Sequence, residues 1–222
     1  MSTTVAFLHT LGGLEAEFDG LFARFVPGAQ AVHIADGTII RTIVREGHIT
    51  PAIERRLMDH VKAAAAFGAD AIQFTCSTVS PLVGAAAKLV RVPVLSIDAP
   101  MYEDAVRAHD SIGMIATNPV TIEPSSSLLE KVIAESGHDK KHEVVLSRRA
   151  YEALLAGDRA AHDELLKDDL TSLASRVEVV CLAQASMARV AEQVDLPVPV
   201  LSSPEPAMRR LADVLARGGR EG

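Results

Sequence analysis

The chain has 222 residues, of which 48% are hydrophobic and 23% charged, an ordinary balance for a globular protein. Its formal net charge is −7 and it has no cluster of Lys and Arg, so nucleic acid and anionic membranes are not expected as partners. No apolar run approaches the length of a membrane span, and MSTTVAFLHT has no basic leader and predicts a first strand.

The two cysteines of the chain are too few for a disulfide framework. The two cysteines show no CxxC spacing, so we expect no structural metal site. We expect a cytoplasmic protein with reduced thiols.

Strand-like and helix-like segments alternate through the first half of the chain. Thr50 and Pro51 predict a helix start, and Gly68 predicts its end. The expected strands are 5–10, 30–36, 71–75 and 92–97, and the expected helices are 14–25, 51–67 and 81–90. This order is typical of a parallel sheet covered by helices.

The same order begins again in the second half. The expected strands are 111–117, 143–147, 177–183 and 198–202, and the expected helices are 121–136, 148–156, 158–174, 186–194 and 206–217. No low-complexity linker separates the segments. The fold class is therefore α/β throughout.

Two pairs of similar strings suggest an internal repeat. VAFLHT is similar to IGMIAT, and VPVLSIDAP is similar to VPVLSSPEP at nearly the same separation along the chain. The alternative to a repeat is chance similarity, because any two α/β units can share such strings. We favour two related half-domains, 1–97 plus 206–222 and 98–205, whose strand ends face a central cleft.

The repeat bears on whether the two cysteines are equivalent. An acidic residue enters each central strand, Asp70 in DAIQFTC and Glu178 in EVVCLAQ. Counted from these residues, Cys76 matches Gln184, whereas Cys181 falls inside its strand. The alternative register aligns the two cysteines but leaves Leu-Ala-Gln-Ala to begin the next helix, a weaker strand exit. We favour the first register.

Cys76 is expected at a strand end, just before a helix N-terminus, a position that favours an anionic group. The alternative is a small buried hydrophobe, the common state of a free cysteine. Hydroxyl side chains crowd this turn at Ser77, Thr78 and Ser80, which favours chemistry. For Cys181, between Val180 and Leu182, the buried alternative is the stronger one.

Three motifs together resemble the Asp/Glu/hydantoin racemase superfamily: TCST, LAQASM and IATNPVT, with further similarity in GHITPAIERRL, VPVLSIDAPM and LLAGD. The resemblance implies two pseudo-symmetric Rossmann-like half-domains, each a mainly parallel sheet flanked by helices, with the active site in the cleft between them. Members include amino-acid and hydantoin racemases, maleate isomerase and arylmalonate decarboxylase. Typically two cysteines flank the substrate α-carbon, and neither a metal nor an organic cofactor is needed.

Residue by residue, the resemblance implies that Cys76 is the catalytic cysteine of the first half-domain. It also implies a set of substrate-binding residues at the strand ends: Thr10, Ser77, Thr78, Thr117, Asn118, Thr121, Gln184 and Ser186. Gln184 stands where the second cysteine is expected, and a glutamine has no proton to exchange at neutral pH.

The first strand ends in His9-Thr10 where glutamate racemases have Asp-Ser, which argues against glutamate as the substrate. His9 is a candidate second base, because imidazole titrates near neutral pH. The alternative is a strand-end histidine bonded to a loop. His33, Asp36 and His48 have two interpretations, as cleft-lining residues or in solvated loop positions, and we favour the second. We expect four further histidines on the surface: His109, His138, His142 and His162.

These observations favour a cofactor-independent racemase or isomerase that acts at the α-carbon of a small carboxylate or hydantoin-like substrate, with Cys76 as acid and base. Two alternatives remain: a one-cysteine decarboxylase or isomerase of the same superfamily, and a non-catalytic carboxylate-binding protein. Because homodimers are common in the family, the resemblance also implies a homo-oligomer.

Overall fold

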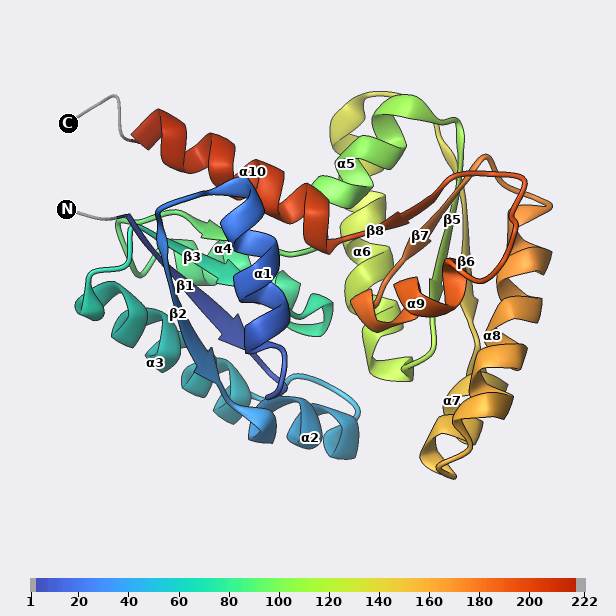
Figure 1. The fold of residues 1–222 in the computed structure, drawn as a ribbon, viewed down its shortest axis with the longest axis horizontal. Coiled ribbons are helices and arrows are strands. Elements are labelled where there is room, and N and C mark those ends of the chain that lie inside the picture. The colour runs from blue at the N-terminus through green and yellow to red at the C-terminus, as the bar shows by residue number, and fades with distance from the viewer. Residues whose placement is uncertain (1–2, 219–222) are drawn as a thin grey trace. The chain divides into compact units, whose positions relative to one another are not determined.

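The computed structural model describes residues 3–218, shown in Figure 1. The ends of the expected first half-domain, 1–2 and 219–222, lie outside the described residues. The described chain forms two compact units, one made of 3–97 with 204–218 and the other of Asp98–Ser203.

Each unit contains a four-stranded sheet in which all neighbouring strands are parallel. The first sheet has the order β2-β1-β3-β4, with β1 Thr4–His9, β2 Gln30–Ala35, β3 Ala71–Phe74 and β4 Val94–Leu95. The second has the order β6-β5-β7-β8, with β5 Ser111–Ala116, β6 Lys141–Leu146, β7 Val179–Leu182 and β8 Val200–Ser202. The identical order confirms the expected α/β fold of two like half-domains.

Helices cover both faces of the first sheet (Figure 1). Its helices are α1 Glu15–Phe25, α2 Gly37–Glu46, α3 Pro51–Phe67, the 3₁₀ helix η1 Ser77–Leu82, α4 Val83–Ala87 and α10 Pro204–Gly218. One core joins Val5 and Phe7 of β1 to Phe18 and Phe22 of α1 and to Met208 of α10. Burial of such side chains stabilises a fold by about 1.5–3 kcal/mol each.

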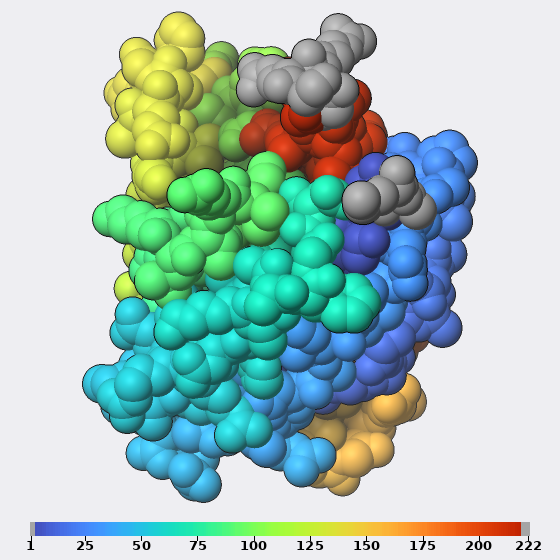
Figure 2. Space-filling model, turned by 90° about the vertical axis from the view of Figure 1, so that its left-hand side faces the viewer, coloured from blue at the N-terminus to red at the C-terminus, as the bar shows by residue number. Residues whose placement is uncertain are grey.

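Helix α3 covers the other face and follows the expected amphipathic pattern. Thr50 caps it by accepting a hydrogen bond from the Ile53 N–H, and Gly68 ends it in the left-handed conformation. Ile53, Leu57 and the other buried residues of α3 face inward, and the colours of α3 appear on the face of the molecule seen in Figure 2. The sequence signals for this helix are therefore confirmed at both ends.

The second sheet is covered by α5 Ala99–Ala108 and α6 Pro119–Ser136 on one face. The other face carries α7 Arg148–Leu155, α8 Arg159–Ala174, the 3₁₀ helix η2 Ala185–Met187 and α9 Ala188–Ala191. Gly113 of β5 allows the close approach of α8, because a Cβ there would lie 2.9 Å from the Leu173 side chain.

In each unit the last strand of the sheet is followed by a helix that packs on the sheet of the other unit. The chain leaves β4 of the first sheet and forms α5, which packs on the second sheet. It then leaves β8 of the second sheet and forms α10, which packs beside α1 on the first. We expected this last helix to begin at 206, and it begins at Pro204.

Two helices were not predicted from the sequence, α2 and α5. Helix α2 is rich in β-branched residues, which have low helix propensity. It forms because Ile39 and Ile43 are buried and because Asp36 and Gly47 cap its two ends. Tertiary burial thus outweighs local propensity here. No helix within 3–218 is long and apolar enough to cross a membrane.

Candidate active site

The carboxyl ends of β3 and β7 share one backbone geometry. Gln73 of β3 pairs with Phe7 of β1, and Cys181 of β7 pairs with Met114 of β5. Three residues further on, Cys76 has φ −131° and ψ 119°, and Gln184 has φ −133° and ψ 125°. The favoured register is confirmed: Cys76 corresponds to Gln184, and Cys181 to Gln73.

The two cysteines lie in different environments. Cys181 is 0% exposed and packs in the core of the second unit with Tyr102, Met114 and Val179. Burial raises the pKa of its thiol to about 12, so it stays protonated at neutral pH. Cys76 is partly exposed at the end of β3. Only Cys76 is therefore placed to meet a solute.

The turn after Cys76 is shorter than the sequence suggested. We expected a helix over 81–90, but the structure has η1 directly after Cys76 and then the five-residue α4. Ser77 and Thr78, both expected to bind substrate, are in η1 and almost fully buried. Cys76 is thus followed by the N–H groups of one short 3₁₀ helix rather than by a long helix dipole.

Gln184 occupies a cradle of donors at the turn between β5 and α6. Its Oε1 accepts hydrogen bonds from Thr117 N at 2.8 Å, Thr117 Oγ1 at 3.1 Å and Asn118 N at 3.0 Å. The Asn118 side chain accepts a bond from Val120 N and caps α6. Three donors on one oxygen at a helix N-terminus are an arrangement that also suits a carboxylate.

This cradle fixes the orientation of the Gln184 carboxamide. Only its oxygen can accept from three donors, so Nε2 points away from them. Nε2 has no hydrogen-bond partner among the described residues and remains a donor at neutral pH. Of the other expected binding residues, Thr121 is buried in the first turn of α6, and Ser186 is exposed in η2.

His9 ends β1 in the first unit and is 2% exposed. Its Nε2 lies 2.8 Å from His33 Nδ1, and its Nδ1 lies 2.9 Å from Thr75 Oγ1. The Thr75 hydroxyl is also 3.0 Å from Leu8 O, and His33 Nε2 is 3.0 Å from Asp19 Oδ1. Both ring nitrogens of His9 therefore have a hydrogen-bond partner. This arrangement is closer to the alternative of a bonded strand-end histidine than to that of a second base.

Burial, and then the neighbouring His33, lower the pKa of His9 to about 4. The carboxylates of Glu15 and Asp19 act in the opposite direction but are outweighed. His9 is consequently a neutral imidazole near pH 7. The adjacent Thr10, expected to bind substrate, is buried at 3% exposure.

Asp36, at the end of β2, was expected in a solvated loop, and that expectation is wrong: it is 7% exposed. Its carboxylate accepts bonds from Thr38 N, Thr38 Oγ1, Arg56 Nε and His60 Nε2. Burial alone would raise the pKa of Asp36, but the bonds from Arg56, Thr38 and His60 outweigh it and hold that pKa well below its usual range. This cluster joins α2 to α3.

Two histidines also differ from the expectation. His33 lies in β2, within the expected strand 30–36, but its side chain is only 14% exposed rather than solvated. His162, expected on the surface, is 9% exposed in α8 and contacts Asp163 at 2.9 Å. In each case a neighbouring carboxylate stabilises the half-buried ring, which a single sequence does not reveal.

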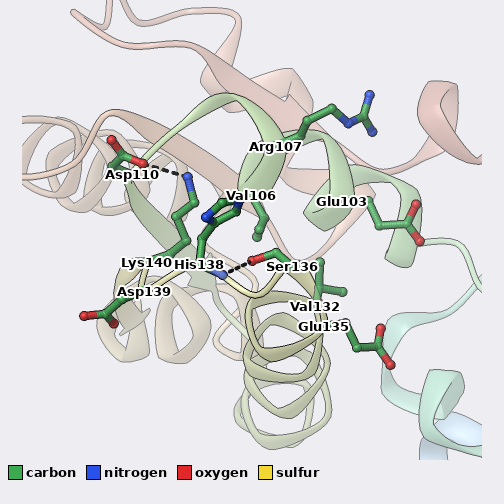
Figure 3. Close-up of a pocket in the computed structure, with 10 residues that line it drawn as sticks. All are labelled: Glu103, Val106, Arg107, Asp110, Val132, Glu135, Ser136, His138, Asp139 and Lys140. Carbon is green, nitrogen blue, oxygen red and sulfur yellow. Dashed lines mark hydrogen bonds and ion pairs between the residues drawn. The ribbon is translucent and has the colours of Figure 1, made fainter.

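A pocket of about 710 Å³ lies at the other edge of the second sheet, where its strands begin (Figure 3). Charged side chains from α5, α6 and the segment before β6 line it, and several of them form ion pairs, with one another or with neighbours outside the lining. Lys140 contacts Asp110 at 2.6 Å, and Glu135 contacts Lys131 at 3.7 Å. The pocket is thus separate from the strand ends that carry Thr117 and Gln184.

Within 3–218, no cluster of three or more His, Cys, Asp or Glu side chains is arranged to hold a metal ion. The chemistry offered by the described residues is that of one partly exposed thiol, a set of hydroxyls and backbone N–H groups, and a neutral imidazole.

Two like parallel sheets, with a thiol at one strand end and a carboxamide held by three donors at the equivalent end of the other, define a duplicated α/β fold. The sequence matches the family described as Asp/Glu/Hydantoin racemase over residues 29–211. The chain belongs to this family and is a racemase-type enzyme.

Solved structures of racemases share the fold at low sequence identity. Glutamate racemase isoform RacE1 from Bacillus anthracis has a TM-score of 0.76 and 18% identity, covering 98% of this chain and 83% of its own. Allantoin racemase from Klebsiella pneumoniae has a TM-score of 0.70 and 19% identity, covering 98% and 89%. An aspartate racemase homologue from Pyrococcus horikoshii has a TM-score of 0.71 and 15% identity, covering 97% and 100%. No curated protein sequence matches the chain.

Proposed function

We propose that the protein is a cofactor-independent isomerase that acts at the α-carbon of a small carboxylate or hydantoin-like compound, with Cys76 as its acid and base. The observation that carries this proposal is the equivalence of Cys76 and Gln184. A thiol stands at one strand end, a carboxamide stands at the other, and Cys181 is buried.

In the proposed reaction the Cys76 thiolate removes the α-proton. The C–H bond breaks, an S–H bond forms, and the electron pair moves onto the adjacent carboxylate or carbonyl oxygen. Donors at Thr10, Ser77 and Thr78 stabilise that oxyanion, which is the costly feature of such an intermediate. The thiol then returns a proton on the same face, either to the α-carbon, which is exchange with retention, or to a neighbouring carbon that shares the negative charge, which is isomerisation by one base. Racemisation would need a second base on the opposite face.

For the second unit we propose carboxylate binding by Thr117, Asn118, Thr121 and Ser186, together with Gln184. The Gln184 carboxamide has two ways to take part. It donates from Nε2 while Oε1 remains in the cradle, or it leaves the cradle and a substrate carboxylate takes the three donors. Either role is one of binding, since an amide does not exchange protons at neutral pH.

One-cysteine decarboxylation is the second candidate, and the carboxamide at position 184 favours it. Because only one face of the α-carbon meets a thiol, the enzyme would suit stereospecific decarboxylation: the C–C bond breaks, carbon dioxide leaves, and Cys76 protonates the carbanion on one face. For His9 we propose a supporting role, since both of its ring nitrogens are engaged.

The test is solvent exchange in D₂O. Single enantiomers of amino acids and hydantoins, and α-substituted malonates, which are achiral, are incubated with wild type, Cys76→Ala and Cys181→Ala, and the α-position is followed by NMR. We expect deuterium at the α-carbon with wild type and Cys181→Ala and none with Cys76→Ala. Exchange that survives in Cys76→Ala would contradict the proposal, and tight binding without exchange would leave a carboxylate-binding protein.

A further inference from the structure

A line of four polar side chains crosses the carboxyl edge of the first sheet. It runs from Asp19 on α1 through His33 on the edge strand β2 and His9 on β1 to Thr75, just beyond β3. The Asp19 end is solvent-exposed, whereas His9 is buried. The second unit has Ala116, Val144 and Ala183 where the first has His9, His33 and Thr75, so the fold does not require this line.

The contacts in this line can be counted in protons. Four contacts are present: Asp19 with His33, His33 with His9, His9 with Thr75, and Thr75 with the Leu8 carbonyl. Each hydrogen bond needs one proton. Two neutral imidazoles and one hydroxyl supply three, so one contact is left without a proton. With one extra proton on the imidazole pair, all four contacts become hydrogen bonds.

The extra proton belongs on His33. His33 faces the Asp19 carboxylate and is nearer to solvent, whereas His9 is buried beside Phe18 and Phe7. The other charged group of α1 near the pair is Glu15. In this state His33 donates from both nitrogens, to Asp19 and to His9.

The directions of the remaining bonds follow from that placement. His9 accepts at Nε2, carries its proton on Nδ1 and donates to Thr75 Oγ1. The Thr75 hydroxyl then donates to Leu8 O, which also accepts from Thr75 N at 3.2 Å. Thr75 is thus held to β1 by two bonds at the point where the chain reaches Cys76.

Loss of the proton reverses the line. His9 then carries its single proton on Nε2 and donates to His33, which still donates to Asp19. The His9 Nδ1 becomes an acceptor, and the Thr75 hydroxyl turns from Leu8 O to His9. The proton count balances in two movements. The His33 Nδ1 proton shifts to His9 Nε2, and the His9 Nδ1 proton is released to solvent, so His33 loses its charge and His9 stays neutral.

We propose that Asp19, His33, His9 and Thr75 form a one-proton relay that couples the charge of His33 to the hydrogen bonding of the strand end that carries Cys76. Thr75 and His9 are positioning residues in this relay. The link to Cys76 chemistry rests on the proposed function, whereas the reversal of the relay does not.

The test of the relay is the tautomer of His9, read from ¹⁵N chemical shifts of the imidazole nitrogens during a pH titration. Above its pKa of about 4 we expect His9 to be neutral, protonated on Nδ1 while His33 is charged and on Nε2 once His33 has lost its proton. Thr75→Val should keep His9 on Nε2 at every pH, and Thr75→Ser should restore the switch. Thr171→Val, an exposed threonine of α8, is the matched control.

The test of positioning is the rate of Cys76 alkylation by iodoacetamide over the same pH range. We expect an inflection at the pH where the His9 tautomer changes, present in wild type, Thr75→Ser and Thr171→Val and absent in Thr75→Val. A His9 tautomer that does not change with His33 overturns the relay. A tautomer change without the inflection overturns the coupling to Cys76. Neither readout needs a substrate, so failure of the proposed function would be distinguishable.

Discussion

The ends of β3 and β7 have the same backbone conformation, but cysteine and glutamine occupy opposite positions in the two. The first unit has glutamine inside the strand and cysteine at its end, and the second has cysteine inside and glutamine at its end. Inside the strand each side chain is fully buried, Gln73 bonded to the Phe74 and Leu95 carbonyls and Cys181 packed in the core. The difference teaches that the position of a residue in the repeat, rather than its chemical type, decides whether it meets a solute.

A second difference concerns the polar line beside each strand end. The first unit connects the end of β3 to solvent through His9 and His33, whereas the second has apolar residues at the equivalent positions. In the second unit, polarity is concentrated in the Gln184 cradle. One unit thus presents a thiol with a titratable support, and the other presents fixed donors.

The largest expected effect separates the two cysteines. Cys76→Ala should lower turnover by about 10²–10⁴-fold, the range for removal of an acid–base group. Cys181→Ala should leave turnover within a few-fold, because Cys181 packs in the core and stays protonated. Turnover of the substrate found by deuterium exchange is the measurement, with circular dichroism to show that both variants fold. Equal losses would restore a two-cysteine mechanism.

The next effect is acid destabilisation through His9. Its pKa of about 4 in the folded state lies below that of an unfolded histidine, near 6.5. Its contribution to stability is therefore complete above about pH 6.5 and is lost as the pH falls toward 4, by about 3 kcal/mol in all. Urea unfolding at a series of pH values measures it.

The control for this effect is a variant comparison. His9→Asn should flatten the change in unfolding free energy between pH 6.5 and 4, while His48→Asn, an exposed histidine, should keep it. Identical pH curves for wild type and His9→Asn would show that His9 titrates normally in the folded protein.

A smaller effect compares the ends of the two edge strands. Asp36 follows β2 and accepts four hydrogen bonds, whereas Ser147 follows β6 and its buried Oγ has no partner among the described residues. Asp36→Asn should cost about 2 kcal/mol of unfolding free energy at pH 7, and less below pH 4, where the unfolded carboxylate is protonated. Ser147→Ala should stay within about 0.5 kcal/mol. Equal losses of unfolding free energy in Asp36→Asn and Ser147→Ala would contradict this difference between the two strand ends.

The smallest expected effect concerns the cradle. If Nε2 of Gln184 donates to the substrate, Gln184→Ala should weaken substrate binding by about 1–2 kcal/mol, seen mainly in KM. If a substrate carboxylate instead takes the three donors of Thr117 and Asn118, Gln184→Ala should leave KM unchanged or lower it. Gln193→Ala, which removes an exposed amide bonded to Arg189 O in the same unit, is the matched control. A loss confined to kcat would indicate that position 184 acts in the chemical step.

Periodicity and repeats in the sequence predicted most of the strands, the fold class and the register that pairs Cys76 with Gln184. These features depend on local signals, such as the caps at Thr50 and Gly68. The relay could not be predicted, because Asp19, His33, His9 and Thr75 come from four separate segments and meet only in the folded sheet. The cradle was predicted in part: its donors were expected to bind a carboxylate, but not to bind Gln184.

The central claim is that one thiol, that of Cys76, exchanges protons with the substrate. The most direct measurement is stereochemically resolved deuterium exchange, with each enantiomer of the substrate incubated separately in D₂O with wild type and Gln184→Cys. We expect exchange confined to one enantiomer in wild type and extended to the other in Gln184→Cys. Equal exchange of both enantiomers by wild type, lost for one of them in Cys181→Ala, would contradict it.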